Sequence, residues 1–472
     1  MKVMLRRVVL RFARDRKANV AIIFALMMVP TVFLLGMTLD YTLALRKREQ
    51  LNAAADAAAI AAVRPAMLTQ TDTSVVKATA EAVFAAKANL PGLSSVPTPT
   101  VTVTDSGLAR TITVSYTAQS INNFPGVLGK QTWQVAGSAT AKASSAPNMN
   151  FYLLLDDSPS MAIAATQTDI NNMITATSSQ PSYARNCAFA CHEAHPNNQN
   201  PSSTNKDNLT VARNNNITLR IDLVTNAVKQ LLVGPWSCPQ SGVSGGVMQC
   251  MAALNNTTYK AAIYTFDYNF NAIQTLTTPT TAGTKIGNIQ LMTVDHQNCV
   301  IYGNCSTDYG SDISGGLTGV NGVMPAPGSG TNQSGDTPQE VVFLVTDGVE
   351  DKLIPKTASC DPNATYPLPT VGTTQVRCQQ PLNTAACTTI KNRGIRIAVL
   401  YTEYLQLPTD GWYNTRIAQF NNPSSSTGTI AQRLESCASP GLYASVQTGG
   451  DISAALTNLF LKVASSTASL VQ

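Results

Sequence analysis

The segment Ala18–Leu39 (ANVAIIFALMMVPTVFLLGMTL) constrains this chain most, because it contains no charged side chain. As a helix it would be roughly 33 Å long, which matches the hydrocarbon thickness of a bilayer. Backbone polar groups inside a bilayer must bond within the protein, so a helix is the structure to expect. The segment therefore predicts a transmembrane helix. A cleaved signal peptide is the alternative interpretation; the length of the run and the charges that follow it argue against that alternative.

The formal net charge of +5 is concentrated before this segment. Residues 1–17 carry seven Lys and Arg against one Asp, so the remaining chain is almost neutral. The basic residues before the span outnumber the cluster Arg46–Arg48 after it, and the positive-inside rule then places the N-terminus in the cytoplasm. The main part of the chain is expected outside. Its neutrality argues against a nucleic-acid-binding surface.

The ten cysteines support this topology, because all lie between Cys187 and Cys437, on the predicted outer side. An even number in an oxidising compartment predicts disulfides, whereas the absence of a CxxC pair argues against a zinc site. CAFACHEAH, which begins at Cys187, has CxxxCH spacing instead of the CxxCH of haem attachment, and we expect a disulfide-closed loop there. Proximity along the chain suggests two pairs, Cys238 with Cys250 and Cys299 with Cys305. Four further cysteines are disulfide candidates without assigned partners: Cys187, Cys191, Cys360 and Cys378.

Between the span and residue 148 the sequence pattern changes from helical to strand-forming. Asp40–Val63 and Thr73–Asn89 have strong helix propensity, whereas Thr98–Ala143 alternates Val and Thr in the period-2 pattern of half-buried antiparallel strands. We predict a helical stalk followed by a small α+β spacer module. The predicted domains are a basic tip (1–17), a transmembrane helix (18–39), the stalk (40–90), the spacer and its linker (91–147), and a main domain (148–472).

The main domain alternates apolar strands with helical patterns, which indicates an α/β fold with a mainly parallel sheet. Polar stretches between these elements are expected to be insertions held by disulfides. The expected strands are Phe151–Leu155, Lys260–Phe266, Val341–Thr346, Ile395–Tyr401 and Leu442–Val446. The expected helices are Leu219–Leu232, Asp312–Val323, Thr384–Arg393, Ile430–Cys437 and Asp451–Ala464, and the insertions are Thr177–Asn216, Gly234–Asn256 and Lys352–Asn383.

Short oxygen-bearing side chains follow the first of these strands. The stretch Asn150–Met161 (NFYLLLDDSPSM) ends in D-x-S-x-S, formed by Asp156, Ser158 and Ser160. Where a strand breaks into a loop, alternate residues can converge on one hard cation. Farther along, VVFLVTDGVED places Asp347 after another apolar strand, with Gly348 for a tight turn. Parallel strands end at the same edge of an open α/β sheet, so these side chains are expected together.

This pattern resembles the metal-ion-dependent adhesion site (MIDAS) of von Willebrand factor A domains. The resemblance implies a Rossmann-like fold, with a mainly parallel sheet flanked by helices, and a further ligand from a loop that in the family carries Thr. YGSDISGGL resembles that loop but has Ser311 at the position, and Thr307 is the alternative ligand. The expected ion is Mg²⁺, with Ca²⁺ or Mn²⁺ possible. In the family, an open coordination position accepts an acidic residue from a protein partner.

The span followed by QLNAAADAAAIAAV resembles the N-terminal region of TadG-like proteins of tight-adherence (Flp) pilus assembly. The resemblance implies a single-pass protein of the bacterial inner membrane with a periplasmic A domain, acting in pilus assembly or anchoring. Its partner would be a pilus or Tad-system component. Lys17–Phe24 lacks the Gly and Glu at which related pseudopilins are cut, so we expect the anchor to stay. The alternative is a membrane-tethered adhesin that binds a host or matrix ligand.

The C-terminal segments CTTIKNRGIRIAVLYT and LESCAS also resemble TadG-like A domains, and the resemblance implies a disulfide between Cys387 and Cys437. Catalysis is not indicated. Asp156 could begin a phosphotransferase motif, but Ser158 stands where the second Asp is required. The single GxSxG match, Gly242–Gly246, lies in a polar insertion without the strand that a nucleophile elbow requires. No catalytic residue is predicted.

Overall fold

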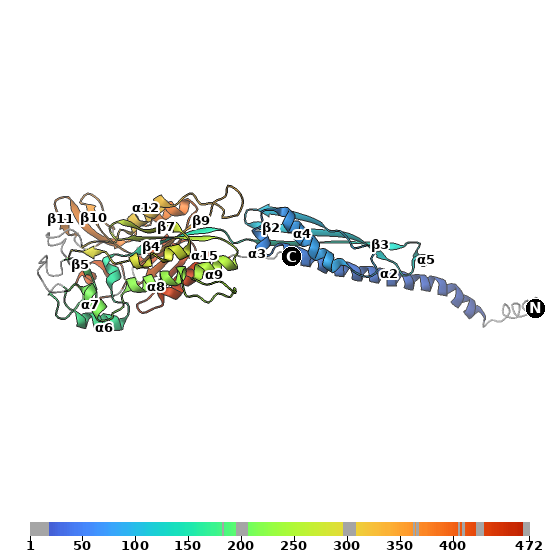
Figure 1. The fold of residues 1–472 in the computed structure, drawn as a ribbon, viewed down its shortest axis with the longest axis horizontal. Helices are drawn as coiled ribbons and strands as arrows, with labels where there is room; N and C mark the ends of the chain where they lie inside the picture. Colours follow the sequence, from blue (N-terminus) through green and yellow to red (C-terminus); the bar gives the residue numbers. More distant parts are fainter. Residues whose placement is uncertain are drawn as a thin grey trace, which may run out of the picture. The chain divides into compact units, whose positions relative to one another are not determined.

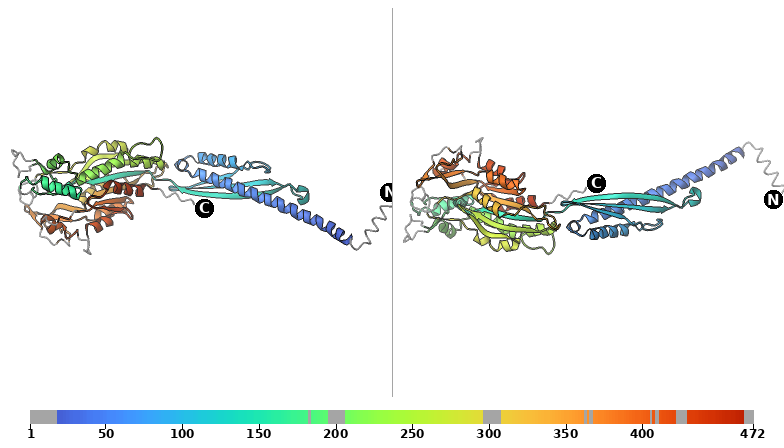
Figure 2. Two further views of the ribbon diagram at one scale, coloured as in Figure 1. Left: turned by 90° about the horizontal axis from the view of Figure 1, so that it is seen from below. Right: turned by 90° about the horizontal axis from the view of Figure 1, so that it is seen from above.

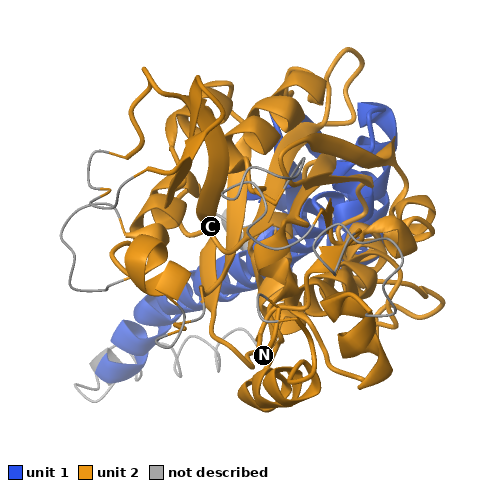
Figure 3. Cartoon of the chain, turned by 90° about the vertical axis from the view of Figure 1, so that its left-hand side faces the viewer, with its two compact units in different colours: residues 1–145, 468–472 blue, residues 146–467 orange. Residues whose placement is uncertain are grey.

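The chain divides into two compact units, residues 1–145 with 468–472 and residues 146–467 (Figure 3). The computed structural model describes residues 18–181, 184–194, 206–295, 308–361, 364, 368–404, 406–407, 411–421 and 429–465. The basic tip, Cys299, Cys305 and Thr307 lie outside the described residues, so the predictions made for them are not addressed by the structure.

The first unit combines one long helix with a three-stranded antiparallel sheet in the order β1-β2-β3 (Figure 1). Figure 2 shows the helix α2 running along the strands in both views. The elements are α2 (Ala18–Ala62), α3 (Pro65–Leu68), α4 (Thr73–Ala88), β1 (Thr100–Ser106), β2 (Ala109–Ile121), α5 (Pro125–Leu128) and β3 (Thr132–Ser144).

The two halves of the helix α2 differ in burial: the C-terminal part is packed in the core of the first unit, and the N-terminal part is exposed. Its C-terminal part buries a stripe of small and aliphatic side chains, spaced three or four residues apart, such as Ala44, Leu51 and Ala58. This stripe packs with α4 and with the inward-facing side chains of β2, so the predicted stalk and spacer share one core. Its N-terminal part is apolar yet exposed, and among the described residues α2 contains the one helix long and apolar enough to cross a membrane.

The second unit is built on a six-stranded sheet in the order β14-β13-β9-β4-β6-β7. All neighbouring strands are parallel except β7, which pairs antiparallel with β6 at the edge. The strands are β4 (Met149–Asp156), β6 (Tyr259–Phe266), β7 (Phe270–Thr277), β9 (Gln339–Thr346), β13 (Arg396–Thr402) and β14 (Tyr443–Val446).

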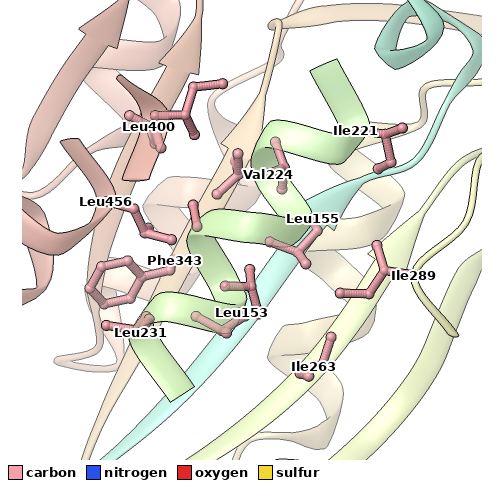
Figure 4. Packing of buried hydrophobic residues seen from close by; sticks show 14 of the residues in the cluster. Leu153, Leu155, Ile221, Val224, Leu231, Ile263, Ile289, Phe343, Leu400 and Leu456 are labelled. Carbon is pink, nitrogen blue, oxygen red and sulfur yellow. The ribbon is translucent and has the colours of Figure 1, made fainter. Parts of the chain in front are cut away.

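Helices cover both faces of this sheet. One face packs against α8 (Arg220–Leu232), α9 (Val247–Leu254) and α15 (Ile452–Ala464), as Figure 4 shows for Leu153 and Leu155 of β4. The other face packs against α12 (Ile313–Val323), α13 (Ala385–Asn392) and α14 (Ile430–Cys437). Every residue of β4 is buried, which explains the unbroken apolar run Phe151–Leu155 within it.

Further short elements lie within the insertions and connections. They are η1 (Pro159–Ala162), α6 (Gln167–Ala176), β5 (His192–Glu193), α7 (Asn208–Asn214), α10 (Pro279–Gly283), η2 (Ile286–Asn288), β8 (Thr293–Val294), β10 (Val349–Pro355), β11 (Thr370–Val371), β12 (Gln375–Pro381) and η3 (Tyr413–Ile417). The strand β12 pairs with both β10 and β11.

The predicted fold class is confirmed, but several elements were not predicted, among them the helices α6, α7 and α9. The edge strand β7 was not predicted, because its side chains are only half-buried and carry no strong apolar pattern. The stretch Lys352–Asn383 was expected to be a polar insertion held by disulfides, and no strand was predicted in it. It instead pairs β10 with β12 as an antiparallel ribbon, since cross-strand ion pairs and hydrogen bonds compensate for its polar composition.

Three disulfides are present among the described residues. Cys387 of α13 bonds Cys437 of α14, the pair implied by the family resemblance, and Cys238 bonds Cys250, the pair suggested by proximity. A third joins Cys360 to Cys378, two candidates that had no assigned partners. These crosslinks tie α9 and the β10–β12 ribbon to neighbouring loops. Each disulfide lowers the conformational entropy of the unfolded chain, and this stabilises the folded state.

Candidate metal centre

The loops that follow β4 and β9 meet the loop before α12 at one edge of the main sheet. Because β4 and β9 are parallel neighbours, the ends of both strands reach the same place. The hydroxyl oxygen of Ser158 lies 3.0 Å from that of Ser160, and the hydroxyl of Ser311 lies 3.2 Å from that of Ser158. The structure thus brings together hydroxyl groups that are far apart in the sequence. Ser311 lies at this cluster, and its role as a ligand stays a prediction.

Two wholly buried carboxylates, Asp156 and Asp347, complete the cluster. The backbone N–H of Ser158 donates to Oδ1 of Asp156 at 3.1 Å, and Thr346 Oγ1 donates to Oδ2 at 2.6 Å. In Asp347, Oδ1 accepts from the N–H of Val349 at 3.4 Å. Its other oxygen, Oδ2, is buried and accepts no hydrogen bond among the described residues. A buried carboxylate oxygen without a donor is costly unless something else neutralises it.

Ionisation of both carboxyl groups in this buried site is unfavourable without a further positive charge. Burial first, and then the charge of Asp347, raise the pKa of Asp156 to about 7. Burial also raises the pKa of Asp347, while the charge of Arg220, the nearby Ser160 hydroxyl and the N–H of Val349 act in the opposite direction. Two neighbouring carboxyl groups in a buried site resist ionising together. A bound cation would favour the ionised form of both.

Sequence reasoning missed Arg220, the first residue of α8, because no local pattern marks a side chain that acts across the sheet edge. Its guanidinium is buried, with Nη1 3.9 Å from Asp347 Oδ2. Among the described residues that Nη1 atom has no hydrogen-bond partner, whereas Nη2 donates to the carbonyl of Glu403 at 2.5 Å. Burial lowers the pKa of Arg220. Arg220 therefore offsets part of the negative charge without filling the space beside Asp347.

The turn after Asp347 requires a glycine. Gly348 has φ of +82°, a conformation that side chains disfavour. A Cβ atom there would also lie 2.5 Å from Ile430 and 2.7 Å from Leu434 of α14. The backbone at Gly348 therefore packs closely against α14, and a larger residue does not fit there. The T-D-G pattern read from the sequence thus turns the chain and directs Asp347 into the cluster.

The residues present fit a divalent cation. The cluster offers carboxylate and hydroxyl oxygens from three loops, which are the ligands that Mg²⁺ and Mn²⁺ prefer. The buried Oδ2 of Asp347 is the atom most in need of a positive partner. No group of three or more His, Cys, Asp or Glu side chains suited to a metal occurs in the described part of the chain. A site here would therefore depend on the serine hydroxyls and on water.

A cavity of about 170 Å³ adjoins this cluster, and Ser160 and Ser311 form part of its wall. The rest of the lining combines aromatic and apolar side chains with a few polar ones, including Cys187 and Cys191. The principal aromatic side chains are Phe189, Tyr404, Trp412 and Tyr413. A cavity of this size suits one side chain of a bound segment rather than a large ligand.

One wall of the cavity is a buried ion-pair network centred on Arg377 of β12. Its Nε and Nη2 donate to the two carboxylate oxygens of Asp351 at 2.8 and 2.6 Å, and Nη1 donates to Asp308 at 3.1 Å. The guanidinium lies 4.9 Å from the ring of Trp412. The N–H of Asp351 donates to the carbonyl of Ser311 at 3.1 Å. The β10–β12 ribbon thereby braces the loop that carries Ser311.

A mainly parallel sheet with helices on both faces, D-x-S-x-S after β4 and an Asp after β9 define a von Willebrand factor A-type domain. The N-terminal segment adds a more particular relationship: residues 18–65 match the family model described as "Putative Flp pilus-assembly TadE/G-like". The resemblance to TadG-like proteins drawn from the sequence is confirmed for this segment. A search of the curated proteins found no match.

The solved structures that the chain matches include pilus proteins. The chain is similar to the von Willebrand factor domain of the type V pili tip protein Mfa5 from Porphyromonas gingivalis (10% identity, 68% of this chain, 96% of that chain, TM-score 0.33). The minor pilin PilB from Streptococcus sanguinis matches at 11% identity over 78% of this chain and 77% of its own, with a TM-score of 0.32. Similarity this distant carries no information on what the present chain binds.

Proposed function

We propose that this protein is a membrane-anchored, non-catalytic component of Flp pilus assembly or anchoring. In this proposal the A domain lies in the periplasm and binds a protein partner through a divalent metal site. The match of residues 18–65 to the TadE/G-like family supports the pilus context, and the exposed apolar half of α2 supports the anchor. The expected location is the bacterial inner membrane, with the N-terminus in the cytoplasm.

The residues that would hold the ion are Asp156, Ser158, Ser160, Ser311 and Asp347. The observation that carries the proposal is the buried Oδ2 of Asp347, which lies at a cluster of hydroxyl groups and accepts no hydrogen bond from the part of the chain that the structure describes. When bound, Mg²⁺ would supply a positive charge with an open position for an oxygen ligand. The protein's own oxygen atoms orient that position, and Arg220 limits the net negative charge of the site.

The chemistry of the site favours a partner with an exposed Asp or Glu. Its carboxylate would reach the cluster beside Ser160 and Ser311, which also border the aromatic cavity. A neighbouring apolar side chain of the same segment could then enter between Phe189 and Trp412. The proposed partner is accordingly a pilus or Tad-system protein that presents an acidic residue next to an apolar one.

Calorimetric titration of the full-length protein in nanodiscs with Mg²⁺ and Mn²⁺ tests the metal site. We expect binding by the wild type and none by Asp156→Ala, because the variant lacks one of the two buried carboxylates. Asp451→Ala is the matched control, since Asp451 is an exposed helix cap distant in sequence from the cluster. Equal binding by wild type and Asp156→Ala would remove the site from the proposal.

Crosslinking in cells, followed by a pull-down with wild type and Asp156→Ala, tests the partner. A pilus or Tad-system protein captured by the wild type and lost in the variant is the expected result. Deletion of the gene separates the two roles considered from the sequence. Loss of pilus fibres supports assembly, whereas intact fibres with reduced attachment would favour a membrane-tethered adhesin.

A further inference from the structure

The tip of the β2–β3 hairpin lies against the apolar half of α2. This hairpin tip comprises residues 122–131 and includes the short helix α5, which lies beside α2 in Figure 1, while the N-terminal part of α2 extends beyond it. The opposite end of β2 forms the β1–β2 hairpin, whose closing pair is Ser106 and Ala109. Only the end of the sheet at the β2–β3 hairpin therefore lies next to the predicted span.

Asp40 fastens the hairpin tip to the helix. Its carboxylate is only 2% exposed and accepts hydrogen bonds from the N–H groups of Asn123 at 2.8 Å and Phe124 at 3.0 Å. Asp40 directly follows the uncharged run Ala18–Leu39. Separation of the tip from the helix would leave this carboxylate and two backbone donors without these bonds. The tip is thus held at a defined level, at the end of the apolar run.

The ring of Phe124 lies against α2 at Gly36. A Cβ atom at this position would lie 3.4 Å from Cγ of Phe124, so the ring packs directly on the helix backbone. Gly36 lies four residues before Asp40, which corresponds to roughly 6 Å along the helix axis. The ring of Phe124 therefore reaches the helix within the uncharged run. If α2 crosses a membrane, this ring lies at the boundary between the hydrocarbon and the headgroups.

The hairpin tip and its strand ends expose apolar side chains beside polar ones. Ile121 is 46% exposed and Phe124 is 41% exposed, and Leu39 of the adjacent helix is 52% exposed. Next to them, the rings of Tyr41 and Trp133 contact edge to face with centroids 6.1 Å apart. Lys130 Nζ lies 5.6 Å from the Trp133 ring. Tyr and Lys side chains are typical of membrane interfaces, where an apolar body and a polar end are both accommodated. The indole Nε1 of Trp133 is instead buried within the protein.

We propose that the hairpin tip is a second membrane contact, inserted into the interface of the bilayer beside the span of α2. A lipid bilayer is the occupant that fits, because the exposed ring of Phe124 lies against the apolar run of α2 at Gly36, the tip carries Lys130, and the exposed Tyr41 follows the run. The contact rests on the proposed membrane anchor. It would fix the tilt of the first unit on the membrane surface, which a single helix leaves free.

Depth-dependent quenching of tryptophan by brominated lipids tests this contact. The full-length chain, with Trp133, Trp236 and Trp412 replaced by Phe, is placed in phosphatidylcholine–phosphatidylglycerol vesicles. One tryptophan is then introduced as Phe124→Trp in the tip, Leu35→Trp in the span, or Thr104→Trp in the exposed part of β1 near the other hairpin. We expect strong quenching at positions 35 and 124 and none at 104.

The outcomes separate the contact from the anchor. Quenching at 35 with values at 124 equal to those at 104 would overturn the contact and leave the anchor intact. Absence of quenching at 35 would overturn both. A second measurement leaves the native tryptophans in place: a photoreactive benzoylphenylalanine at position 124 should crosslink to lipid, and the same group at position 104 should not. Absence of a lipid adduct at 124 would also overturn the contact.

Discussion

Two clusters of buried charge lie on either side of Ser311, and they differ in how completely their charges are paired. In the network of Arg377, Asp308 and Asp351, three guanidinium nitrogens donate at distances of 2.6 to 3.1 Å. In the cluster of Asp156, Asp347 and Arg220, Asp347 Oδ2 lies 3.9 Å from Nη1 of the guanidinium, and neither atom has a hydrogen-bond partner within the described ranges.

This difference indicates that one cluster stabilises the fold and the other is suited to bind a ligand. A buried network in which the charges are paired stabilises one conformation, and removal of one member is costly. A cluster with a carboxylate oxygen left over retains the capacity to bind a cation, and this capacity lowers the stability of the ion-free domain. The Arg377 network therefore positions the Ser311 loop, and the Asp156 cluster is the candidate for ligand binding. Each of the following predictions could contradict this division.

Arg377→Met should have the largest effect. It leaves the carboxylates of Asp308 and Asp351 without the guanidinium, so we expect the free energy of unfolding to fall by about 3–5 kcal/mol. Urea unfolding, followed by circular dichroism, measures the change. Arg433→Met is the matched control, because Arg433 pairs with Asp361 at 3.2 Å but is one-third exposed. There we expect a loss of about 1 kcal/mol or less. Similar losses in the two variants would contradict a special role for the network.

Asp347→Asn should affect binding rather than stability. We expect Mg²⁺ affinity to fall by at least about 100-fold, or about 2.7 kcal/mol, because the variant loses a charged ligand. The ion-free variant should unfold at the same urea concentration as the wild type or a higher one, since one buried negative charge is gone. Calorimetric titration and urea unfolding give the two values. A strongly destabilised variant with unchanged Mg²⁺ affinity would show that this cluster is structural.

The stabilisation by Mg²⁺ should increase with pH. The pKa of Asp156 is raised to about 7 in the folded, ion-free protein, above an unfolded value near 4. Folding therefore favours the protonated form, and this group's contribution to stability falls as pH rises from about 4 through 7. Mg²⁺ competes with that proton. The rise in Tm caused by Mg²⁺ should be larger at pH 8 than at pH 5.5, and Asp156→Asn should remove the difference.

Ser311 should have the smallest effect. Ser311→Ala removes one neutral hydroxyl, and we expect Mg²⁺ affinity to fall by about tenfold, or about 1.4 kcal/mol. Ser311→Thr keeps the hydroxyl and should bind nearly as well as the wild type. Calorimetry of Thr307→Ala examines the alternative ligand. A loss in Thr307→Ala with none in Ser311→Ala would assign the ligand to Thr307.

Much of the second unit could be predicted from local patterns. Unbroken apolar segments predict buried parallel strands, as in β4 and β9, because such strands are covered on both faces. Polar residues at the ends of these strands, Asp156 and Asp347, then had to meet at one edge of the sheet. Half-exposed strands such as β7 lack this signal. The β10–β12 ribbon is stabilised by cross-strand pairs such as Arg377 with Asp351, which no short sequence window contains.

By itself, the sequence determined the apolar span, the alternation of strands and helices, and the short motifs that follow β4 and β9. All of these depend on residues close together in the chain, whose periodicity or length reflects one environment. Only the tertiary structure decided that Arg220 lies beside Asp347, that Arg377 braces the Ser311 loop, and that Asp40 fastens the hairpin tip to α2. These contacts join distant segments, and their energies depend on burial and distance, which exist only once the chain has folded.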